Sequence, residues 1–456
     1  MQLVAYGAQD IYLTGNPQIT FFKVVYRRHT NFSMEAIEQT FNGSADFGKR
    51  VTCTVSRNGD LMHRVYLQVT IPKTKGTALS ETQGGRWLNH LGHVLIKYAE
   101  VEIGGQRIDK HYGDWMHIWN ELSQEAGKKA GYANMIGNVP SLTAVSATLG
   151  EDKTANKPEM DLYIPLEFWF CRNPGLALPL IALQYHEVKI NLEFRSFSEC
   201  SYNLEAAPLE AASLFVDYIY LDTDERRRFA QVSHEYLIEQ VQFTGDESVS
   251  SVSNKIKLNF NHPCKELIWV VQKDSVLDAS GGKQWFNYTD AIDTSYLTGT
   301  PSDPYGGGMT GGRYVISSVA GASNMVFPTS TGKDEDTYLS WTDRDSGFNP
   351  VFSAKLQLNG HDRFSERMGR YFNLVQPYQH HTNVPATGIN VYSFGLKPEE
   401  HQPSGTCNMS RIDNATLQLT LTAATVESDD AKVRVYATNY NVLRIMSGMG
   451  GLAYSN

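Results

Sequence analysis

Hydrophobic and polar positions alternate in many short runs along this 456-residue chain, and one such run occurs twice with a similar continuation. Residues 99–109 (AEVEIGGQRID) and 354–364 (AKLQLNGHDRF) both begin with the alternation of a half-buried β-strand. Each strand runs into a two-residue turn, Gly104-Gly105 or Asn359-Gly360, and such pairs accept the positive φ angles of tight hairpins. The pattern therefore predicts the same hairpin at two places.

A helix-like stripe follows each predicted hairpin. The first stripe places apolar residues at i, i+3, i+4 and i+7, after Asp114 as a candidate N-cap: Trp115, Ile118, Trp119 and Leu122. The second keeps a similar spacing: Phe364, Met368, Tyr371, Phe372 and Val375. We therefore expect a helix after each hairpin.

Three further pairs of segments occur in the same order in the two halves of the chain. They are 64–69 (RVYLQV) with 266–271 (ELIWVV), 188–194 (VKINLEF) with 415–421 (ATLQLTL), and 216–221 (VDYIYL) with 433–438 (VRVYAT). A constant order with varying spacing is typical of two copies of one β domain, because surface loops tolerate insertions and strands do not. The alternative is that any two β-rich segments look alike at this level of comparison.

The full pattern predicts an all-β chain with two domains. Strands are expected near 51–57, 61–71, 94–103, 106–111, 162–170, 186–195 and 214–221, and again near 234–243, 255–260, 265–273, 351–359, 389–395, 414–423 and 431–439. Asn58-Gly59 predicts a hairpin turn between the first two strands.

The predicted organisation is an arm at 1–25, a first β domain at 26–222, a linker at 223–230 and a second β domain at 231–456. Asp222 or Thr223 is expected to cap a short helix in the linker. The stretch 274–348 is rich in Gly, Ser, Thr and Asp, and a loop of this length is typical of a functional element. Its aromatic residues predict that it folds as a projecting structure: Trp285, Phe286, Tyr288, Tyr314, Tyr338 and Trp341.

Charge and cysteine content restrict the function. The net charge is −9, which does not favour a protein that binds nucleic acid through its overall charge. The exception is the segment up to residue 33, where Lys23, Arg27 and Arg28 against Asp10 give +2. The five scattered cysteines form no CxxC pair, which favours buried free thiols in a reducing compartment. The opening MQLVAYGAQD lacks the features of a signal peptide, and no window of 18 apolar residues predicts a membrane span.

Motifs for catalysis, cofactors or metals are missing from the sequence. It contains no GxxxxGK[ST], GxGxxG, GxSxG or HExxH. None of the 13 histidines forms an H-x-H pair, and His380-His381 is interpreted as a loop pair because adjacent strand residues face opposite sides. The Asp343-x-Asp345-x-Gly347 run lacks the further ligands of a calcium loop. We therefore expect no catalytic residue, no cofactor and no metal site.

Long blocks at both ends and in the middle of the chain carry a resemblance to a known family. They are GAQDIYLTGNPQITFFKVVYRRHTNF (7–32), LDTDERRRFA (221–230), YSFGLKPEEHQPSGTCNMSRIDNATL (392–417) and RVYATNYNVLRIMSGMGGLAYSN (434–456). These blocks closely resemble the major capsid proteins of nucleocytoplasmic large DNA viruses. The resemblance implies two consecutive eight-stranded jelly rolls, a double jelly roll with short helices in its loops, in agreement with the duplication.

The family resemblance also implies a function and partners. It implies a late structural protein of the virion, assembled in the host cytoplasm, whose homotrimers form pseudo-hexagonal capsomers that tile an icosahedral shell. Minor capsid and penton proteins are the implied partners, and the arm would contact them or the internal viral membrane. By the same resemblance, Gly7–Phe32 and Ser393–Asp413 would lie at inner-face or interface contacts, with five residues expected to be exposed there: Arg27, Arg28, Pro398, Glu399 and Glu400.

Two other functions stay open at this point. A jelly-roll protein that binds glycans or attaches to a host would use the aromatic residues of 274–348 and would form no shell. A metal-dependent jelly-roll enzyme of the cupin type would need a histidine pattern that the chain lacks. The prediction is accordingly a structural protein and not an enzyme.

Overall fold

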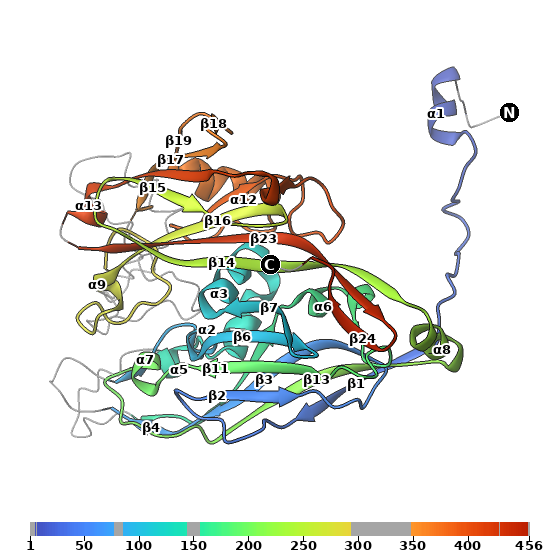
Figure 1. The fold of residues 1–456 in the computed structure, drawn as a ribbon, viewed down its shortest axis with the longest axis horizontal. Coiled ribbons are helices and arrows are strands. Elements are labelled where there is room, and N and C mark those ends of the chain that lie inside the picture. Colours follow the sequence, from blue (N-terminus) through green and yellow to red (C-terminus); the bar gives the residue numbers. More distant parts are fainter. Residues whose placement is uncertain are drawn as a thin grey trace, which may run out of the picture.

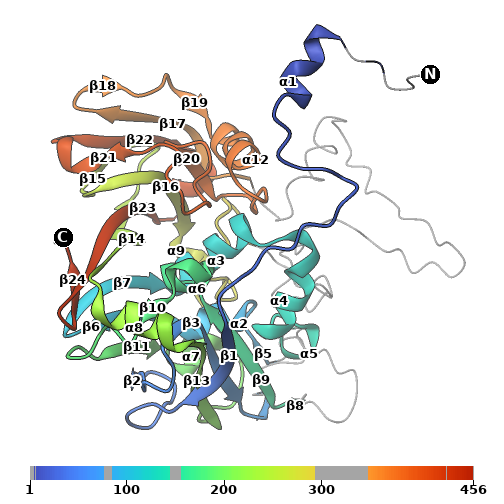
Figure 2. The same cartoon turned by 90° about the vertical axis from the view of Figure 1, so that its right-hand side faces the viewer.

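The two halves of the chain form two β-sandwiches that lie against each other with short helices between them (Figure 1). The computed structural model describes residue 5 and residues 7–76, 85–143, 156–292, 348–427 and 429–454. The α8 helix links the sandwiches at one end, and the N-terminal arm leaves the body from the same end (Figures 1 and 2).

The first sandwich consists of two antiparallel sheets. One has the order β1-β13-β3-β10 with β9 also paired to β3, and the other has the order β2-β11-β6-β7. The strands are β1 (Phe32–Gln39), β2 (Arg50–Thr54), β3 (Leu61–Ile71), β6 (Ile96–Ile103), β7 (Gln106–Tyr112), β9 (Met160–Leu166), β10 (Leu178–Pro179), β11 (Val188–Phe194) and β13 (Ala211–Leu221). Their inward side chains form one large apolar core, as the period-2 alternation requires.

The second sandwich repeats this arrangement. One sheet has the order β14-β23-β16-β20 with β21 on β16 and β24 on β23, and the other has the order β15-β22-β17-β18 with β19 on β17. The strands are β14 (His234–Val249), β15 (Ser253–Leu258), β16 (Pro263–Lys273), β17 (Val351–Leu358), β18 (His361–Asp362), β19 (Arg367–Met368), β20 (Asn390–Ser393), β21 (Cys407–Asn408), β22 (Ala415–Leu421), β23 (Ala431–Met446) and β24 (Met449–Leu452).

The predicted duplication is confirmed strand by strand. β1, β13 and β3 take the places that β14, β23 and β16 take in the second sandwich, and β2-β11-β6-β7 matches β15-β22-β17-β18. The pair β9 and β10 lies along β3 as β20 and β21 lie along β16, so each pair is one interrupted strand position. Each sandwich therefore has eight strand positions. All three predicted segment pairs fall on matching strands.

The remaining elements are short. Two small strand pairs, β4 (Thr74–Lys75) with β8 (Asn156–Lys157) and β5 (Arg86–Trp87) with β12 (Ser201–Tyr202), extend the first half. The helices are η1 (Ala8–Asp10), α1 (Ile11–Thr14), α2 (Leu91–Leu95), α3 (Gly113–Ser123), η2 (Ala126–Lys128), α4 (Lys129–Met135), α5 (Pro140–Thr143), α6 (Trp169–Arg172), η3 (Pro174–Leu176), α7 (Phe197–Cys200), α8 (Thr223–Gln231), α9 (Asp274–Leu277), η4 (Tyr371–Val375, a π-helical turn), α12 (Gln376–His380), η5 (Met409–Arg411) and α13 (Ala423–Val426). The Asp222 side chain accepts a hydrogen bond from Thr223 N and caps α8, as predicted.

Two of the three predicted hairpin turns are confirmed. Gly104-Gly105 has φ angles of 58° and 87°, and Asn359-Gly360 has 49° and 82°. The turn predicted at Asn58-Gly59 is wrong, because β2 and β3 belong to different sheets and the segment crosses the sandwich between them. Gly59 is needed there for a close approach, since a Cβ atom would lie 2.6 Å from Cβ of Tyr218.

The helix predictions are partly confirmed. The first stripe forms α3, but the N-cap is Tyr112, and Asp114 lies inside the helix and is buried. The second stripe is helical only from Tyr371 onward. The chain before it returns to pair with β17 through β19, so Phe364 and Met368 lie outside the helix.

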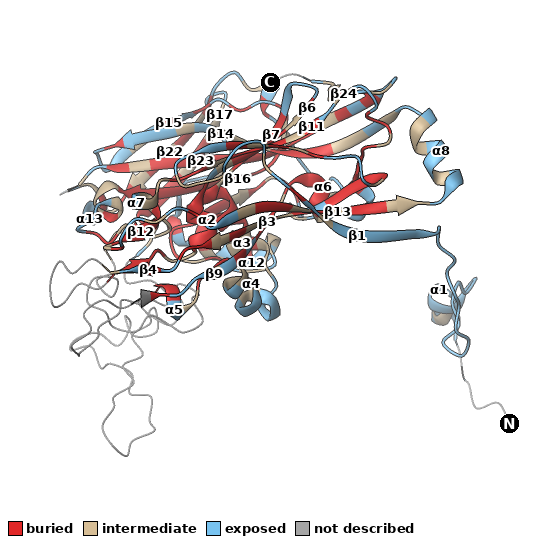
Figure 3. Ribbon diagram, turned by 90° about the horizontal axis from the view of Figure 1, so that it is seen from below, coloured by how far each residue is buried: buried red, intermediate tan, exposed pale blue. Residues whose placement is uncertain are grey.

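The arm is almost wholly exposed and extends beyond its predicted end. Extended backbone continues past residue 25 to Asn31, because the chain meets a pairing partner, β13, only at Phe32 (Figure 3). Among the described residues, no helix is long and apolar enough to cross a membrane.

Candidate assembly surfaces

An apolar contact holds the two sandwiches together. α3 of the first sandwich presents its predicted stripe to the outer face of the β23-β16-β20 sheet of the second. The cluster consists of Trp115, Ile118, Trp119, Leu122, Ile268, Val270, Tyr288, Ile389, Val391 and Tyr436. β16 is therefore buried on both faces: Leu267 and Trp269 enter the second core, whereas Ile268 and Val270 contact the α3 side. We call this contact the joint.

An arginine that is bonded to both sandwiches lies beside the apolar joint. Arg434 Nη1 donates to Asp114 Oδ2 of α3 at 2.9 Å, and Arg434 Nε donates to Asp246 Oδ1 of β14 at 2.9 Å. Gln272 Oε1 accepts a third bond at 2.9 Å. Burial lowers the pKa of Arg434, but the carboxylates of Asp114 and Asp246 outweigh burial and raise it above its ordinary value. The guanidinium therefore stays charged within the joint.

A second charged group spans the joint at Glu239. Its carboxylate accepts from Arg172 Nη1 at 3.0 Å and from Lys265 Nζ at 2.9 Å. Burial would raise the pKa of Glu239, but His401, Arg172 and Lys265 together lower it to about 2. The Arg172 guanidinium also lies 4.2 Å from the ring centre of Trp119. Residues of α6, α3, β14 and β16 thus meet around one carboxylate.

The C-terminal hairpin closes the same seam at the far side. β24 turns back along β23, and Tyr185 N of the first half donates to Gly448 O at 3.0 Å. Gly450 N donates a hydrogen bond to His186 Nδ1 at 3.1 Å. A cavity of about 410 Å³ lies next to this hairpin between β7 and β14, with Leu452 at its wall.

The three residues of the 393–413 segment that we expected to be exposed differ in burial. Glu400 is exposed, but Pro398 is buried and Glu399 is half-buried, so the expectation of exposure is wrong for these two. Glu399 Oε1 accepts from His381 Nδ1 at 2.8 Å, and His381 Nε2 donates to Glu266 Oε2 at 2.8 Å. The loop therefore folds back onto β16 through a fully buried imidazole.

The electrostatics of this group favour a charged histidine. Burial lowers the pKa of His381, but Glu266 and Glu399 outweigh burial and raise it to about 9. Burial raises the pKa of Glu399, whereas the bonds from His381 and Thr382 bring it below its usual value. His381 was interpreted as part of a loop pair, and it in fact follows the end of α12 and bridges two acids.

Arg27 and Arg28 lie exposed in the arm, as expected. The arm also exposes an unusual number of large apolar side chains: Ile11, Tyr12, Leu13, Ile19, Phe21, Phe22, Val24, Val25 and Tyr26. Phe22 is 98% exposed, so the arm contributes nothing to the core of its own chain. A segment of this composition is typical of a contact surface rather than of a solvated tail.

The described part of the 274–348 stretch does not project. Trp285 Nε1 donates to Glu199 O at 2.9 Å, Phe286 stacks on His117 with ring centres 4.2 Å apart, and Tyr288 is 1% exposed. Residues 285–288 therefore pack against the first sandwich, and the predicted projection is wrong for them. Tyr314, Tyr338 and Trp341 lie outside the described residues.

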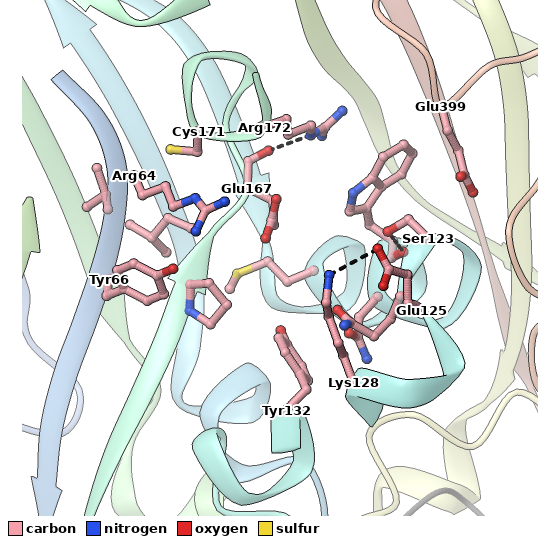
Figure 4. Close-up of a pocket in the computed structure, with 17 residues that line it drawn as sticks. Arg64, Tyr66, Ser123, Glu125, Lys128, Tyr132, Glu167, Cys171, Arg172 and Glu399 are labelled. Carbon is pink, nitrogen blue, oxygen red and sulfur yellow. Dashed lines mark hydrogen bonds and ion pairs between the residues drawn. The ribbon is translucent and has the colours of Figure 1, made fainter. Parts of the chain in front are cut away.

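A polar pocket of about 370 Å³ lies where α3, α4 and the Glu399 loop approach β3 and β9 (Figure 4). Charged residues line it: Arg64, Glu125, Lys128, Glu167, Arg172 and Glu399. Lys128 Nζ and Glu125 Oε1 form an ion pair at 3.0 Å. Burial raises the pKa of the Cys171 thiol far above its ordinary value, so this thiol is not a nucleophile at neutral pH.

Three histidines meet beside this pocket, a cluster that the sequence analysis missed. His90 and His93 come from the start of α2, and His117 comes from α3. One ring nitrogen of each lies within 4.8 Å of the other two. Burial lowers the pKa of His90 to about 4 and those of His93 and His117 well below the ordinary value. The i, i+3 spacing of the first two was the only sequence signal.

The cysteine prediction is confirmed for most thiols. Cys53, Cys171, Cys200 and Cys264 are buried and free, and Cys407 is half-buried and free. Burial raises the pKa of Cys53 to about 11, and it raises those of Cys200 and Cys264 as well.

Both halves of the chain match models of one virus protein family. Residues 20–222 match the major capsid protein N-terminus, and residues 225–451 match the large eukaryotic DNA virus major capsid protein. The chain belongs to the major capsid protein family of nucleocytoplasmic large DNA viruses. It is a structural protein of the virion capsid shell rather than an enzyme, as its relatives are.

Relatives of known identity cover the whole capsid protein. The major capsid protein of Phaeocystis pouchetii virus is 57% identical over 100% of this chain and 99% of its own length. That of Paramecium bursaria Chlorella virus 1 is 43% identical over the same shares. As a capsid component, this protein assembles with copies of itself and with other capsid components.

Solved structures identify the fold. The capsid of PBCV-1 matches with a TM-score of 0.70 and 38% identity, covering 96% of this chain and 100% of that chain. The Faustovirus major capsid protein, at 12% identity, matches with a TM-score of 0.71 over 97% of this chain and 94% of its own, which shows the shared fold alone. The two sandwiches are thus the two consecutive jelly rolls of a double jelly roll, and we call them barrels below.

Proposed function

We propose that this capsid protein forms homotrimers, and that these are pseudo-hexagonal capsomers tiling an icosahedral shell. Three chains with two matching barrels each supply six barrels around one threefold axis. A closed threefold ring needs a heterologous contact, in which one surface of each chain meets a different surface of the next. Both surfaces of such a contact are available on this chain.

The contact between barrels inside the chain supports this proposal. In the joint, α3, which follows the first duplicated hairpin, covers the outer face of the second barrel's β23-β16-β20 sheet. The matching face of the first barrel is the outer face of β13-β3-β9, and no helix of the second barrel covers it within the described residues. Tyr163 there is 42% exposed, and Tyr66 and Phe215 are half-buried.

The second barrel carries the complementary element. Its η4–α12 segment follows the duplicated hairpin as α3 does in the first barrel. Val375 and Tyr378 are 39% and 80% exposed on it. Repeating the joint between chains would place η4–α12 of one subunit on the β13-β3-β9 face of the next. The same contact, used once within and once between chains, would give a near-sixfold ring.

The apolar, basic arm would then serve contacts outside the trimer. Its aromatic residues and its positive charge, with Arg27 and Arg28, suit minor capsid or penton proteins or an anionic membrane surface on the inner side of the shell. In this proposal the protein is made late and assembles in the host cytoplasm, with no cofactor and no direct contact with nucleic acid.

The test is the solution mass of the purified protein by light scattering on a sizing column. A trimer has three times 51.0 kDa, 153 kDa. We expect the unmodified chain at that mass and Tyr378→Asp or Tyr163→Asp close to 51.0 kDa, because a charge would be buried without a partner at the subunit contact. Tyr454→Asp, at a 62% exposed tyrosine outside both surfaces, is the control and should stay trimeric. A monomeric unmodified chain contradicts the trimer.

The arm is tested separately by deleting residues 1–25. We expect the truncated chain to remain a trimer and to lose binding to vesicles with anionic lipid or to minor capsid proteins in a co-sedimentation assay. A truncated chain that no longer forms trimers would place the arm in the subunit interface instead.

A further inference from the structure

The histidine cluster formed by His90, His93 and His117 lies at a point where three parts of the chain meet. His90 precedes α2, His93 lies within it, and His117 lies on α3. Phe286, from the connection between β16 and β17 of the second barrel, stacks on His117 with an angle of 14° between the rings. His93 is 0% exposed and His117 is 4% exposed.

The cluster leaves polar atoms buried without partners. The Nδ1 atoms of His93 and His117 are inaccessible to solvent and have no hydrogen-bond partner. A buried polar atom without a hydrogen-bond partner destabilises the folded protein, whereas an apolar ring of the same shape would not. His90 is also held in the left-handed region at φ 52°, which is strained for a residue with a side chain. Packing alone therefore does not explain why three imidazoles lie here, where they leave polar atoms without partners and strain the backbone of His90.

We propose that His90, His93 and His117 bind Zn²⁺, a divalent transition-metal ion, with a water molecule as the fourth ligand. Imidazole nitrogens are preferred ligands of Zn²⁺, and three histidines with one water form a common tetrahedral set. A neutral imidazole offers a lone pair on one ring nitrogen, and the Nδ1 atoms of His93 and His117 have no other partner. The sequence analysis expected no metal, because it looked for H-x-H on a strand and not for histidines on two helices.

The spacing of the nitrogens suits such an ion. Three atoms at the largest separation, 4.8 Å, would stand about 2.8 Å from a common centre. In a tetrahedral set with Zn–N bonds of about 2.0–2.1 Å, each nitrogen stands about 1.9 Å from the axis through the ion, so each moves inward by roughly 0.9 Å at most. Modest rotation about χ2 of the three rings supplies this movement, because that torsion has a broad minimum.

Neighbouring groups orient the ligands. Tyr132 Oη lies 2.7 Å from His93 Nε2 and can accept a hydrogen bond from it, which leaves Nδ1 of that ring for the metal. The Asn138 side chain holds His90 in place, since Asn138 Oδ1 accepts from His90 N at 3.2 Å. Tyr132 also lines the 370 Å³ pocket, so a route from solvent ends one side chain from the cluster (Figure 4).

The bound ion would connect α2 to α3 and, through the Phe286 ring on His117, hold the part of the 274–292 segment around Phe286 against the first barrel. Because α3 supplies one side of the joint, the metal would stabilise the contact between the barrels as well as the first barrel.

The experiment uses the purified full-length protein, stripped with a chelator and then titrated with CoCl₂ and with ZnCl₂. We expect one Co²⁺ per chain with the visible absorption of a four-coordinate ion, its displacement by Zn²⁺, and a higher Tm with Zn²⁺ than without. Absence of stoichiometric Co²⁺ and Zn²⁺ binding to the folded protein overturns the proposal.

Variants identify the ligands. His90→Asn suits the left-handed backbone, since Asn tolerates it, and His117→Phe keeps the ring that stacks on Phe286. We expect each to weaken Co²⁺ binding by about 100-fold or more, beyond the 10–100-fold typical of a lost outer-sphere partner. His361→Gln, an exposed histidine of β18, is the control and should bind as the unmodified chain does. Should one variant fail to fold, the other decides, and binding unchanged in a folded variant overturns the assignment.

Discussion

β3 and β16 occupy the same place in the two barrels, yet they are buried differently. In β3 the outward side chains, among them Arg64 and Gln68, are exposed or half-buried, and only the inward ones are covered. In β16 every residue after Pro263 is buried, on both faces. An offset of 202 residues relates the two strands, so Gln68 corresponds to Val270 and Arg64 to Glu266. The same fold thus carries one face that the other barrel covers and one that, among the described residues, no helix of the other barrel covers.

The difference shows how a duplicated domain can build an assembly. The second barrel has Ile268 and Val270 on its outer face where the first has Tyr66 and Gln68, and α3 covers these two apolar side chains. The first barrel keeps Tyr66, Gln68 and Tyr163 there, a mixed surface that is soluble alone and can still be covered. The face covered by α3 and the matching face of the first barrel therefore differ in side chains rather than in topology.

The largest effect is expected from a charge placed at matching positions of the two strands. Val270→Asp buries an unpaired carboxylate in the joint and should lower the free energy of unfolding by about 4 kcal/mol or more. Gln68→Asp should cost under about 1 kcal/mol in the subunit and instead weaken the trimer. Thermal unfolding at fixed protein concentration and the solution mass distinguish the two outcomes. Equal losses of stability would remove the contrast between the faces.

Removing the buried arginine of the joint should cost slightly less. Arg434→Met removes the cation that bonds both Asp114 and Asp246, while Arg195 stays 3.8 Å from Asp114. Breaking a buried pair on one side costs about 3–5 kcal/mol, and the remaining cation places this variant near the lower end. Arg444→Met is the control, because Arg444 and Glu235 form an exposed pair at 2.7 Å that is worth less than about 1 kcal/mol. The measurement is urea unfolding of both variants. A loss at Arg434 no larger than at Arg444 would mean that the joint does not depend on this cation.

Stability is expected to depend on pH through His381. Its partner Glu266 lies in β16 at the position that corresponds to the exposed Arg64 of β3. The pKa of His381 is raised to about 9 in the folded protein, against 6.5 for the free side chain. The stability it contributes is therefore complete below pH 6.5 and is lost as the pH rises through 9, a loss on the order of 3 kcal/mol.

The Tm measured from pH 6 to pH 10 tests this. The unmodified chain should lose stability over that interval, and His381→Gln should lose much less over the same interval. The acids that face His381 are Glu266 and Glu399, and Thr382 and Thr438 bond to their oxygens. Equal slopes in both proteins would show that the imidazole is not charged.

The smallest effect concerns the duplicated hairpin turns. Gly105→Ala and Gly360→Ala should each cost about 1 kcal/mol, because both glycines have positive φ, at 87° and 82°, and open space around them. Gly104→Ala should cost more, since its Cβ would lie 2.4 Å from Nδ1 of His186, the residue that bonds to the C-terminal hairpin. Differential scanning calorimetry of the three variants would show whether the turns are equivalent apart from this neighbour.

Much of the fold could be predicted because strands carry their own signal. The alternation in RVYLQV and the turn residues Gly104 and Asn359 depend on local geometry, and all appear where predicted. The turn at Asn58 was not predictable, because the same dipeptide suits a hairpin and a crossing between sheets. The end of the arm depends on which residue first meets β13, and that is a property of tertiary pairing.

The assembly surfaces were harder to predict than the strands. Glu399 looked like an exposed loop residue, and only the fold brings His381 and Glu266 to it from segments far apart in the chain. Asp114 looked like a helix cap, and its partner Arg434 lies 320 residues away. The aromatic residues at 285–288 looked like a projecting surface, whereas hydrogen bonds and ring contacts with the first barrel bury them. Contacts of this range leave no periodic pattern in the sequence.

The hairpin at β24 ties the end of the chain to its middle and so sets a time in synthesis. The ribosome completes the first barrel early, and domains generally fold as they emerge. Tyr185 and His186, however, receive their partners Gly448 and Gly450 only after more than 260 further residues have been made. A nascent chain therefore keeps that flank of the first barrel uncovered until the β23–β24 hairpin has emerged.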